Sequence, residues 1–165
     1  MTLALWIVLA VAVQRLGELV LASRNTKALK EQGAVEVGAA HYPLFVILHS
    51  SWLAALVWYA LKDPELIWLP FAVFLAMQAA RVWVIASLGR FWTTRIITVP
   101  SAPLVRKGPY RFLKHPNYIV AWVEIVTLPM AFGWWEAVVV FGVLKAALLA
   151  YRIKIEDVAL SARAD

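Results

Sequence analysis

The sequence contains no cysteine, and only 16% of its 165 residues are charged. The absence of cysteine excludes disulfide bonds, iron–sulfur clusters, thiolate zinc sites and a cysteine nucleophile. Soluble domains are about one quarter charged, and a soluble core this small could not bury a chain that is 63% hydrophobic. Together with a mean hydropathy of +0.75, this composition excludes a disordered chain and predicts a single-domain integral membrane protein over residues 1–165.

Long apolar runs divide the chain into segments that could cross a membrane as helices. A crossing needs about 20 mostly apolar residues, and runs of this kind, the last two shorter, occupy residues 2–21, 43–61, 66–88, 118–132 and 134–151. Only Gly133 and its neighbours separate the last two, which predicts a tight helical hairpin. We therefore expect an all-α membrane protein of about five transmembrane helices. Three lie in residues 1–88, and a long loop, the hairpin and a helix extension fill residues 89–165.

Basic residues are divided unevenly between the connecting segments. Twelve of the 16 Lys and Arg residues fall in residues 23–42, 89–117 and 152–165, which share one side of the membrane if the chain crosses five times. Only Lys62 falls in a connection on the other side. The positive-inside rule then places the N-terminus outside and the C-terminus in the cytoplasm of an inner or plasma membrane. The net charge of +6 is thus a signal of topology, and we expect no nucleic-acid partner.

A few charged and amide side chains interrupt the apolar spans, where each needs a partner. Arg15 and Glu18 are three residues apart on the first predicted helix and can pair there. Gln78 and Arg81 share one face of the third. We expect this second pair either to hydrogen-bond to another helix or to line a site.

The second, fourth and fifth spans also carry isolated polar residues. Glu124 and Lys145 lie in the two arms of the predicted hairpin, where a cross-hairpin ion pair is the natural arrangement. His49 follows His41 by eight residues in the second span, a spacing that raises the question of a metal or haem. With no cysteine and no nearby carboxylate, we expect His49 to be a hydrogen-bonded core residue, and no metal site.

The fifth predicted helix has a polar stripe. Lys145, Leu149, Arg152 and Glu156 follow the helical spacing i, i+4, i+7 and i+11, so they share one face. The amphipathic pattern continues past the membrane edge, which predicts a helix that runs on to about Leu160. The plainest role for Arg152 and Glu156 is an ion pair between successive turns.

The segment 89–117 is too long to be only a connector in so compact a protein. Its X-Pro steps favour extended backbone, whose polar groups need partners from protein, water or a ligand. Aromatic and basic residues alternate through it, and this composition suits a flat, polar-edged ligand such as an adenine nucleoside. The residues concerned are Phe91, Trp92, Arg95, Tyr110, Arg111, Phe112, His115 and Tyr118. The segment therefore predicts a ligand site at the cytoplasmic membrane face.

Two motifs carry a resemblance to a known family. The run Gly108-Pro-Tyr-Arg-Phe-Leu-Lys-His-Pro-Asn-Tyr118 is followed by a hydrophobic hairpin and then by Arg152-x-x-x-Glu156-Asp157. Over residues 88–160 this order resembles the isoprenylcysteine carboxyl methyltransferase family. The segment 88–94 also resembles a small bacterial branch of that family, sometimes encoded beside polyketide synthases that make alkylpyrones.

The resemblance implies an intramembrane enzyme that uses S-adenosylmethionine. It implies that Arg152 is the catalytic residue, facing the methyl acceptor. The implied cofactor-binding residues are Ala102, Pro103, Leu104, Val105, Tyr110, His115, Pro116, Asn117, Tyr118 and Glu156, with Arg95 added from some relatives.

The function expected on this basis is transfer of a methyl group to an oxygen of a lipophilic acceptor that enters from the bilayer. The acceptor would be an alkylpyrone or polyketide hydroxyl, or a prenylcysteine-type carboxylate, ahead of a phospholipid amine. Two alternatives stay open. One is a membrane reductase of the sterol-reductase type that binds NADPH at a related hairpin, and the other is a non-enzymatic accessory subunit in which Arg152 and Glu156 only pair with each other.

Overall fold

The chain forms a bundle of helices, seen here in a computed structural model that describes residues 1–99 and 105–161. The long helices are α1 (Leu3–Glu31), α2 (Tyr42–Ala60), α3 (Trp68–Leu88), α4 (Pro116–Ala131) and α5 (Trp135–Ser161). Short elements lie between them: β1 (Val35–Val37), η1 (Ala39–His41), η2 (Gly89–Phe91), β2 (Ile96–Thr98) and η3 (Gly108–Arg111).

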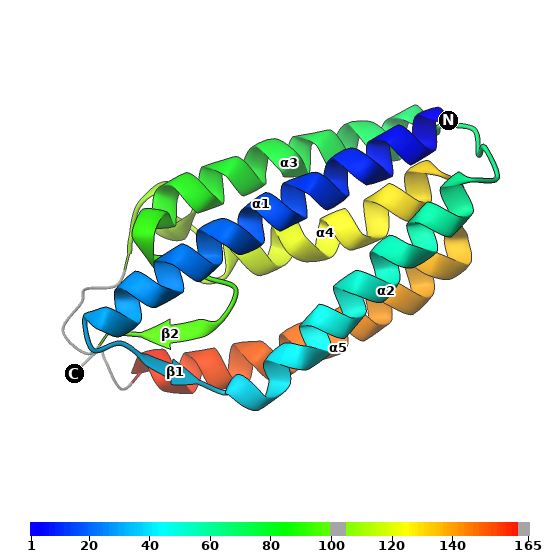
Figure 1. Ribbon diagram of the computed structural model, residues 1–165. Coiled ribbons are helices and arrows are strands. Elements are labelled where there is room, and N and C mark those ends of the chain that lie inside the picture. Colours follow the sequence, from blue (N-terminus) through cyan, green and yellow to red (C-terminus); the bar gives the residue numbers. More distant parts are fainter. Residues whose placement is uncertain (100–104, 162–165) are drawn as a thin grey trace.

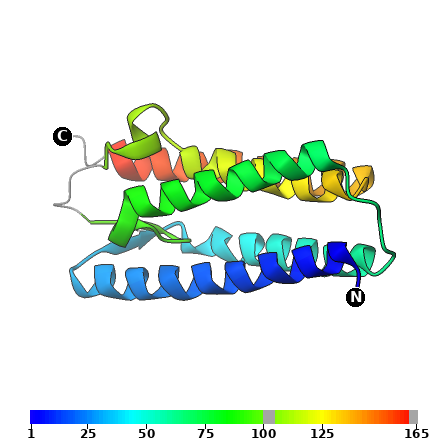
Figure 2. The ribbon, with the colours of Figure 1, turned by 90° about the horizontal axis from the view of Figure 1, so that it is seen from above.

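The five helices run side by side along a common direction (Figure 1). Seen from above, α1 and α2 form one layer, and α3, α4 and α5 form the other (Figure 2). The N-terminus lies at one end of the bundle, whereas β1, β2 and the end of α5 lie at the opposite end (Figure 1). This arrangement places the long segment before α4 beside the last turns of α5.

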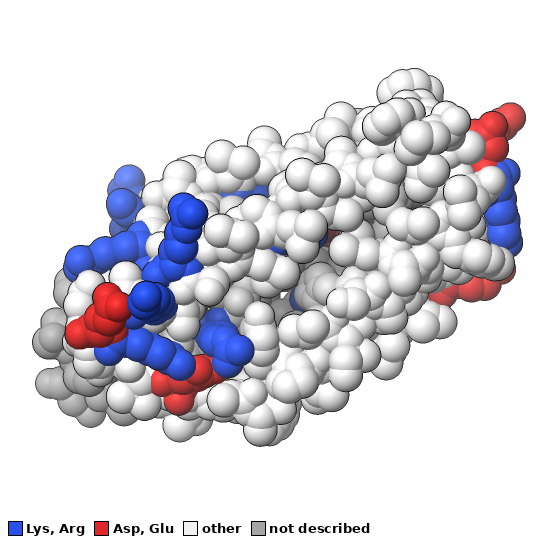
Figure 3. Space-filling model, viewed as in Figure 1, with Lys and Arg blue, Asp and Glu red and all other residues white. Residues whose placement is uncertain are grey.

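Three of the helical segments in the described residues are long and apolar enough to cross a membrane, namely Leu3–Glu31, Ala39–Ala60 and Trp68–Phe91. Helix α4 has only 16 residues, which rise about 24 Å, and α5 carries charged side chains within its apolar part. In the face shown in Figure 3, Lys, Arg, Asp and Glu gather at the two ends of the bundle, and in the broad belt between them charged atoms are visible only in recesses of the surface. The prediction of an all-α membrane protein is confirmed.

Two features differ from the sequence prediction. Helix α1 continues ten residues beyond its predicted end and has 29 residues, about 43 Å of rise against about 30 Å of bilayer core. Its last turns therefore project beyond the apolar belt. There β1 and β2 pair as a two-stranded antiparallel sheet, with Glu36 opposite Ile97. Strands of three residues carry too little alternating pattern to be recognised in a sequence.

The predicted hairpin of α4 and α5 is present and tightly packed. Gly133 turns between the helices with a φ of +70°, a conformation that costs glycine little. A Cβ at Gly142 would lie 2.9 Å from Val126 Cγ1, so the two helices approach closely there. Trp122 Nε1 donates a hydrogen bond of 2.9 Å to the Gly142 carbonyl. The hairpin thereby fixes the register between the start of α4 and the end of α5, where the predicted site residues lie.

Candidate functional site

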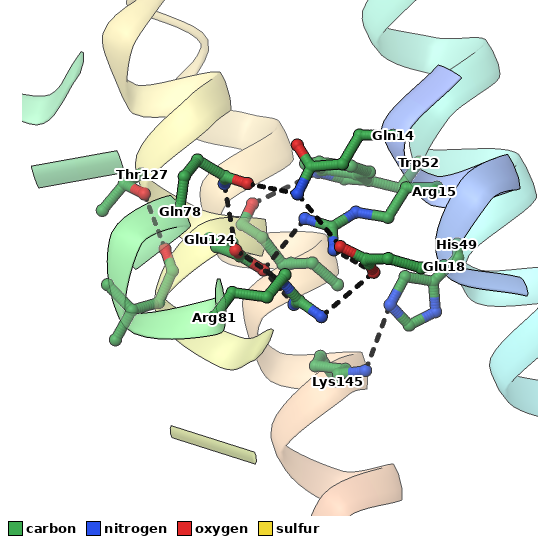
Figure 4. Close-up of polar contacts among 12 residues, drawn as sticks. Gln14, Arg15, Glu18, His49, Trp52, Gln78, Arg81, Glu124, Thr127 and Lys145 are labelled. Atoms are coloured by element: carbon green, nitrogen blue, oxygen red, sulfur yellow. Dashed lines mark hydrogen bonds and ion pairs between the residues drawn. The ribbon is translucent and has the colours of Figure 1, made fainter. Parts of the chain in front are cut away.

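Charged side chains from α1, α3 and α4 meet in the middle of the bundle (Figure 4). Arg81 donates hydrogen bonds to both carboxylate oxygens of Glu124. Arg15 bridges Glu124 at 3.1 Å and Glu18 at 2.7 Å. Glu124 is only 2% exposed, so its charge depends on these two guanidinium groups. The predicted pair of Arg15 and Glu18 is confirmed.

Two glutamines complete this network. Gln78 donates to Glu124 at 2.9 Å, and Gln14 donates to Gln78 at 2.8 Å. Gln78 and Arg81 therefore both serve interhelical hydrogen bonding, the first of the two roles considered for them. The expected ion pair between Glu124 and Lys145 is wrong, because Glu124 binds Arg15 of α1 and Arg81 of α3.

Lys145 instead lies against α2. Its ammonium group is 3.2 Å from His49 Nε2 and 4.8 Å from the centre of the Phe45 ring. His49 Nδ1 lies 2.8 Å from the Phe45 carbonyl, an oxygen that can only accept, so Nδ1 carries the proton and Nε2 accepts from Lys145. His49 is thus a hydrogen-bonded interior residue, as predicted.

Arg152, Tyr118 and Glu156 form one hydrogen-bonded chain at the charged end of the bundle. Arg152 Nε donates to the Tyr118 hydroxyl at 2.8 Å, and that hydroxyl in turn donates to Glu156. Arg152 Nη2 donates to the Thr94 carbonyl at 2.9 Å. Among the described ion pairs none joins Arg152 to Glu156, so the ion pair considered from their spacing is replaced by a bridge through Tyr118.

His115 sits beside this chain at the N-cap of α4. Its ring stacks on Tyr118 with 5.4 Å between centres. Nε2 lies 3.0 Å from Asp157 Oδ1, and Nδ1 lies 3.7 Å from Glu156 Oε2. The hydrogen bond from His115, with the positive charge of Lys114, lowers the pKa of Asp157 although burial opposes this. His115 therefore links the start of α4 to two successive carboxylates of α5.

The turn before α4 is docked on α3 through a glycine. Gly108 has a φ of +56°, and a Cβ there would lie 2.0 Å from Ser87 Oγ. The same turn, η3, places Tyr110 against a cluster that contains Trp92. Burial, and then the negative charge of Glu156, raise the pKa of the Tyr110 hydroxyl. Tyr110 thus lies near the carboxylate end of the hydrogen-bonded chain.

Arg95 lies directly before β2, and no described contact joins it to that chain. It pairs with Glu36 of β1 and lies 4.1 Å over the Tyr42 ring. Lys30 reaches the same carboxylate at 2.7 Å. Burial raises the pKa of Glu36, but hydrogen bonds from Lys30 and Arg95 more than offset this and leave it below its usual value. Arg95 therefore ties the small sheet to α1 and α2, away from Glu156.

A cavity of about 610 Å³ opens between α1, the start of α2 and the residues directly before β2. Its wall follows one stripe of α1 from Leu19 through Thr26 to Lys30 and is closed by Tyr42, Thr94 and Arg95. Leu19 belongs to the apolar span, whereas Lys30 lies at the charged end. Thr94 lines the polar end of this cavity, and its carbonyl accepts a hydrogen bond from Arg152. The cavity therefore adjoins the hydrogen-bonded chain of Arg152, Tyr118 and Glu156.

The structure brings most of the predicted site residues together. Arg152, Tyr118, Glu156 and His115 are joined by direct contacts, and Pro116 is the first residue of α4. Val105 is half-buried before η3. The predicted residues Ala102, Pro103 and Leu104 lie outside the described part of the chain. Thr94 was not among the predicted residues, because it contributes a backbone carbonyl and so leaves no signal in its residue type.

A nucleoside cofactor needs unpaired polar groups, and two of the three buried atoms without a described partner belong to the predicted site residue Asn117 and to Trp92, which packs with Tyr110; the third is His41 Nδ1. Asn117 Oδ1 and Trp92 Nε1 have no hydrogen-bond partner among the described residues. Buried polar atoms are seldom left unpaired in folded proteins. An amide acceptor, an indole donor and the Glu156 carboxylate together suit the amino and hydroxyl groups of S-adenosylmethionine. No cluster of three or more potential metal ligands occurs in the part of the chain that the structure describes.

Comparison with known proteins places the chain in a family. Over 160 residues it is 39% identical to the uncharacterized protein YpbQ of Bacillus subtilis, covering 94% of this chain and 95% of that protein. It is 26% identical over 152 residues to an uncharacterized protein of Haemophilus influenzae, covering 89% of this chain and 88% of that protein. No solved structure gives a significant match. Residues 68–162 match the model of one family, and the chain therefore belongs to the isoprenylcysteine carboxyl methyltransferase family.

Proposed function

We propose that the protein is an S-adenosylmethionine-dependent O-methyltransferase of the membrane. The acceptor is lipophilic, either an alkylpyrone or polyketide hydroxyl or a prenylcysteine-type carboxylate. One observation carries the proposal: the Tyr118 hydroxyl joins Arg152 to Glu156. An accessory subunit predicts instead that these two charges pair with each other, an arrangement that the described contacts do not contain.

Glu156, Asn117 and Tyr110 form the cofactor side of the proposed site. The Glu156 carboxylate accepts hydrogen bonds and offers a negative charge to a cationic ligand. S-adenosylmethionine supplies a methyl group on a positively charged sulfur, and an oxygen that attacks it in line releases S-adenosylhomocysteine. Because this displacement needs no metal and no strong base, the protein contributes mainly position and charge.

Arg152 forms the acceptor side. Its guanidinium is held by Tyr118 and Thr94, and its remaining N–H groups can bind an acceptor oxygen. A phenolate, enolate or carboxylate is already a nucleophile near neutral pH, and a fixed cation favours that ionised form. A cationic amine would be repelled, which argues against phospholipid N-methylation.

The cavity beside Thr94 supports entry of the acceptor from the bilayer. Its wall passes from Leu19 in the apolar belt to Lys30 and Arg95 at the charged end, so an amphiphile fits it with its tail toward the lipid. With the N-terminus outside, the charged end faces the cytoplasm, where the polar cofactor is available.

The test is calorimetric binding to the protein purified in a neutral detergent. We expect S-adenosylhomocysteine to bind and NADPH not to bind. Absence of S-adenosylhomocysteine binding would overturn the proposal, and binding of NADPH alone would replace it with a reductase.

A second measurement addresses the acceptor side. We expect Arg152→Ala to lower methyl transfer to a long-chain hydroxypyrone at least about 100-fold, with little change in S-adenosylhomocysteine affinity. The matched control is Arg90→Ala, which removes an exposed arginine from the same end of the bundle. Equal loss in both variants would contradict the role given to Arg152.

A further inference from the structure

Lys145 is a buried basic residue whose surroundings contain little negative charge. Its side chain is 3% exposed and lies two turns from Arg152 on the same face of α5, about 10 Å along the helix. The charged groups near it are three arginines, Arg15, Arg81 and Arg152, and one carboxylate, Glu124. That carboxylate is already bound by two guanidinium groups. A cation this deep in a membrane protein is costly unless it meets an anion.

The donors of Lys145 are only partly used. An ammonium group has three N–H donors, and one is directed at His49 Nε2. Phe45 offers a further weak contact, since its ring lies 4.8 Å from Lys145 Nζ and 5.2 Å from Arg152 Cζ. Among the described residues, no carboxylate forms an ion pair with Lys145. The other donors have no hydrogen-bond partner among the described residues, and an anionic oxygen would supply one.

The position of Lys145 also fits a ligand that approaches between α1 and α2. The surface is hollowed between these two helices, and Lys or Arg atoms are visible at the bottom of the hollow (Figure 3). His49 of α2 and Lys145 of α5 point toward one another (Figure 4). An anion that moved along this groove toward the charged end would pass Lys145 before it met Arg152.

We propose that Lys145, oriented by His49, is a second acceptor-binding residue, which selects amphiphiles with an anionic head and passes them to Arg152. This inference rests on the proposed function and adds a specificity-determining residue to it. It requires no covalent step at Lys145. Arg152 holds the acceptor oxygen during methyl transfer, whereas Lys145 acts on binding of the acceptor.

The test compares a long-chain anion with a neutral molecule of the same length. Hexadecanoate and hexadecanol are titrated into the detergent-purified protein, with and without S-adenosylhomocysteine. We expect the wild type to bind hexadecanoate at least about tenfold more tightly than hexadecanol, because one hydrogen bond to a charged group contributes a difference of that size. We expect Lys145→Met to abolish this preference by weakening hexadecanoate binding alone. Lys154→Met, which removes an exposed lysine of the same helix, should keep it.

The melting temperature separates this role from a purely structural one. Removing a buried charge that lacks a carboxylate partner removes a desolvation cost, so Lys145→Met should melt no lower than the wild type. A lower melting temperature with an unchanged preference would assign Lys145 to packing and overturn the inference. So would a wild type that binds both probes equally. Failure of S-adenosylhomocysteine to bind counts against the proposed function instead, because the preference for hexadecanoate is also measured without it.

Discussion

The hydroxyl group of Tyr118 accepts a hydrogen bond of 2.8 Å from Arg152 Nε and donates its own proton to Glu156. The proposed acceptor residue and the proposed cofactor residue are thereby aligned by one oxygen atom, which α4 supplies to two successive turns of α5. Methyl transfer in line depends on such alignment.

Tyr118→Phe should therefore lower turnover more than it lowers affinity. We expect a fall in kcat of about tenfold, the effect of losing one charge-assisted hydrogen bond, and a smaller change in S-adenosylhomocysteine binding. Steady-state kinetics and calorimetry separate the two. The control is Tyr59→Phe, because Tyr59 stacks on Trp134 at the opposite end of the bundle. A Tyr118→Phe enzyme with wild-type kcat would contradict the alignment.

Glu156→Gln should act mainly on the cofactor. The substitution keeps the size of the side chain and removes its charge, so we expect S-adenosylhomocysteine to bind about 10- to 100-fold more weakly. Glu136→Gln provides the same chemical change in the first turn of α5, far from the site, and should leave the affinity unchanged. If both variants bind equally well in calorimetry, the cofactor lies elsewhere.

Glu124→Gln should lower the stability of the bundle rather than act on the reaction directly. It would leave Arg81 and Arg15 with Glu18 as their shared carboxylate in place of two carboxylates, and breaking a buried ion pair costs about 3–5 kcal/mol. We expect a much lower melting temperature in detergent and poor recovery of folded protein.

The same network provides a check on this explanation. In the double variant with Glu124→Gln and Arg81→Gln, the buried positive charge of Arg81 is removed together with the negative charge of Glu124, its ion-pair partner. The loss in melting temperature should therefore be smaller than the sum of the two single losses. Additive losses would mean that the two residues stabilise the bundle independently.

Asp157 should make stability depend on acid pH. The hydrogen bond from His115 lowers the pKa of this carboxyl below its ordinary value of 3.8. Its stabilising contribution is therefore complete above that value and is lost as the pH falls through the lower value of the folded state. We expect Asp157→Asn to melt below the wild type at pH 6, and the difference to shrink toward pH 3. A difference that stays constant would exclude the ionised carboxyl as its source.

The sequence was sufficient to predict those features that leave a pattern of residue types. Apolar runs predicted the spanning helices, Gly133 predicted the hairpin, and the spacing of Arg152 and Glu156 predicted their common face on α5. The family resemblance predicted the residues that surround Tyr118. Each of these depends on the local sequence or on the order of motifs along the chain.

Contacts between distant helices could not be predicted in the same way. The partner of Glu124 is Arg81 rather than Lys145, and this choice depends on how the hairpin rotates against α1 and α3. The Thr94 carbonyl that orients Arg152 belongs to the backbone, and β1 pairs with β2 across more than fifty residues of chain. Such contacts are decided by packing, which a single sequence does not display.

Gly108→Ala should disrupt the packing of the turn that precedes α4 against Ser87 of α3. A Cβ would lie 2.0 Å from Ser87 Oγ, and alanine is strained at a φ of +56°, which together cost about 1–3 kcal/mol. Because Tyr110 follows two residues later and His115 is the N-cap of α4, we expect a lower melting temperature and weaker S-adenosylhomocysteine binding. Gly17→Ala is the matched control, since nothing lies within 4 Å of its Cβ position and alanine favours a helix. If Gly108→Ala melts and binds as the wild type does, this turn does not position the cofactor residues.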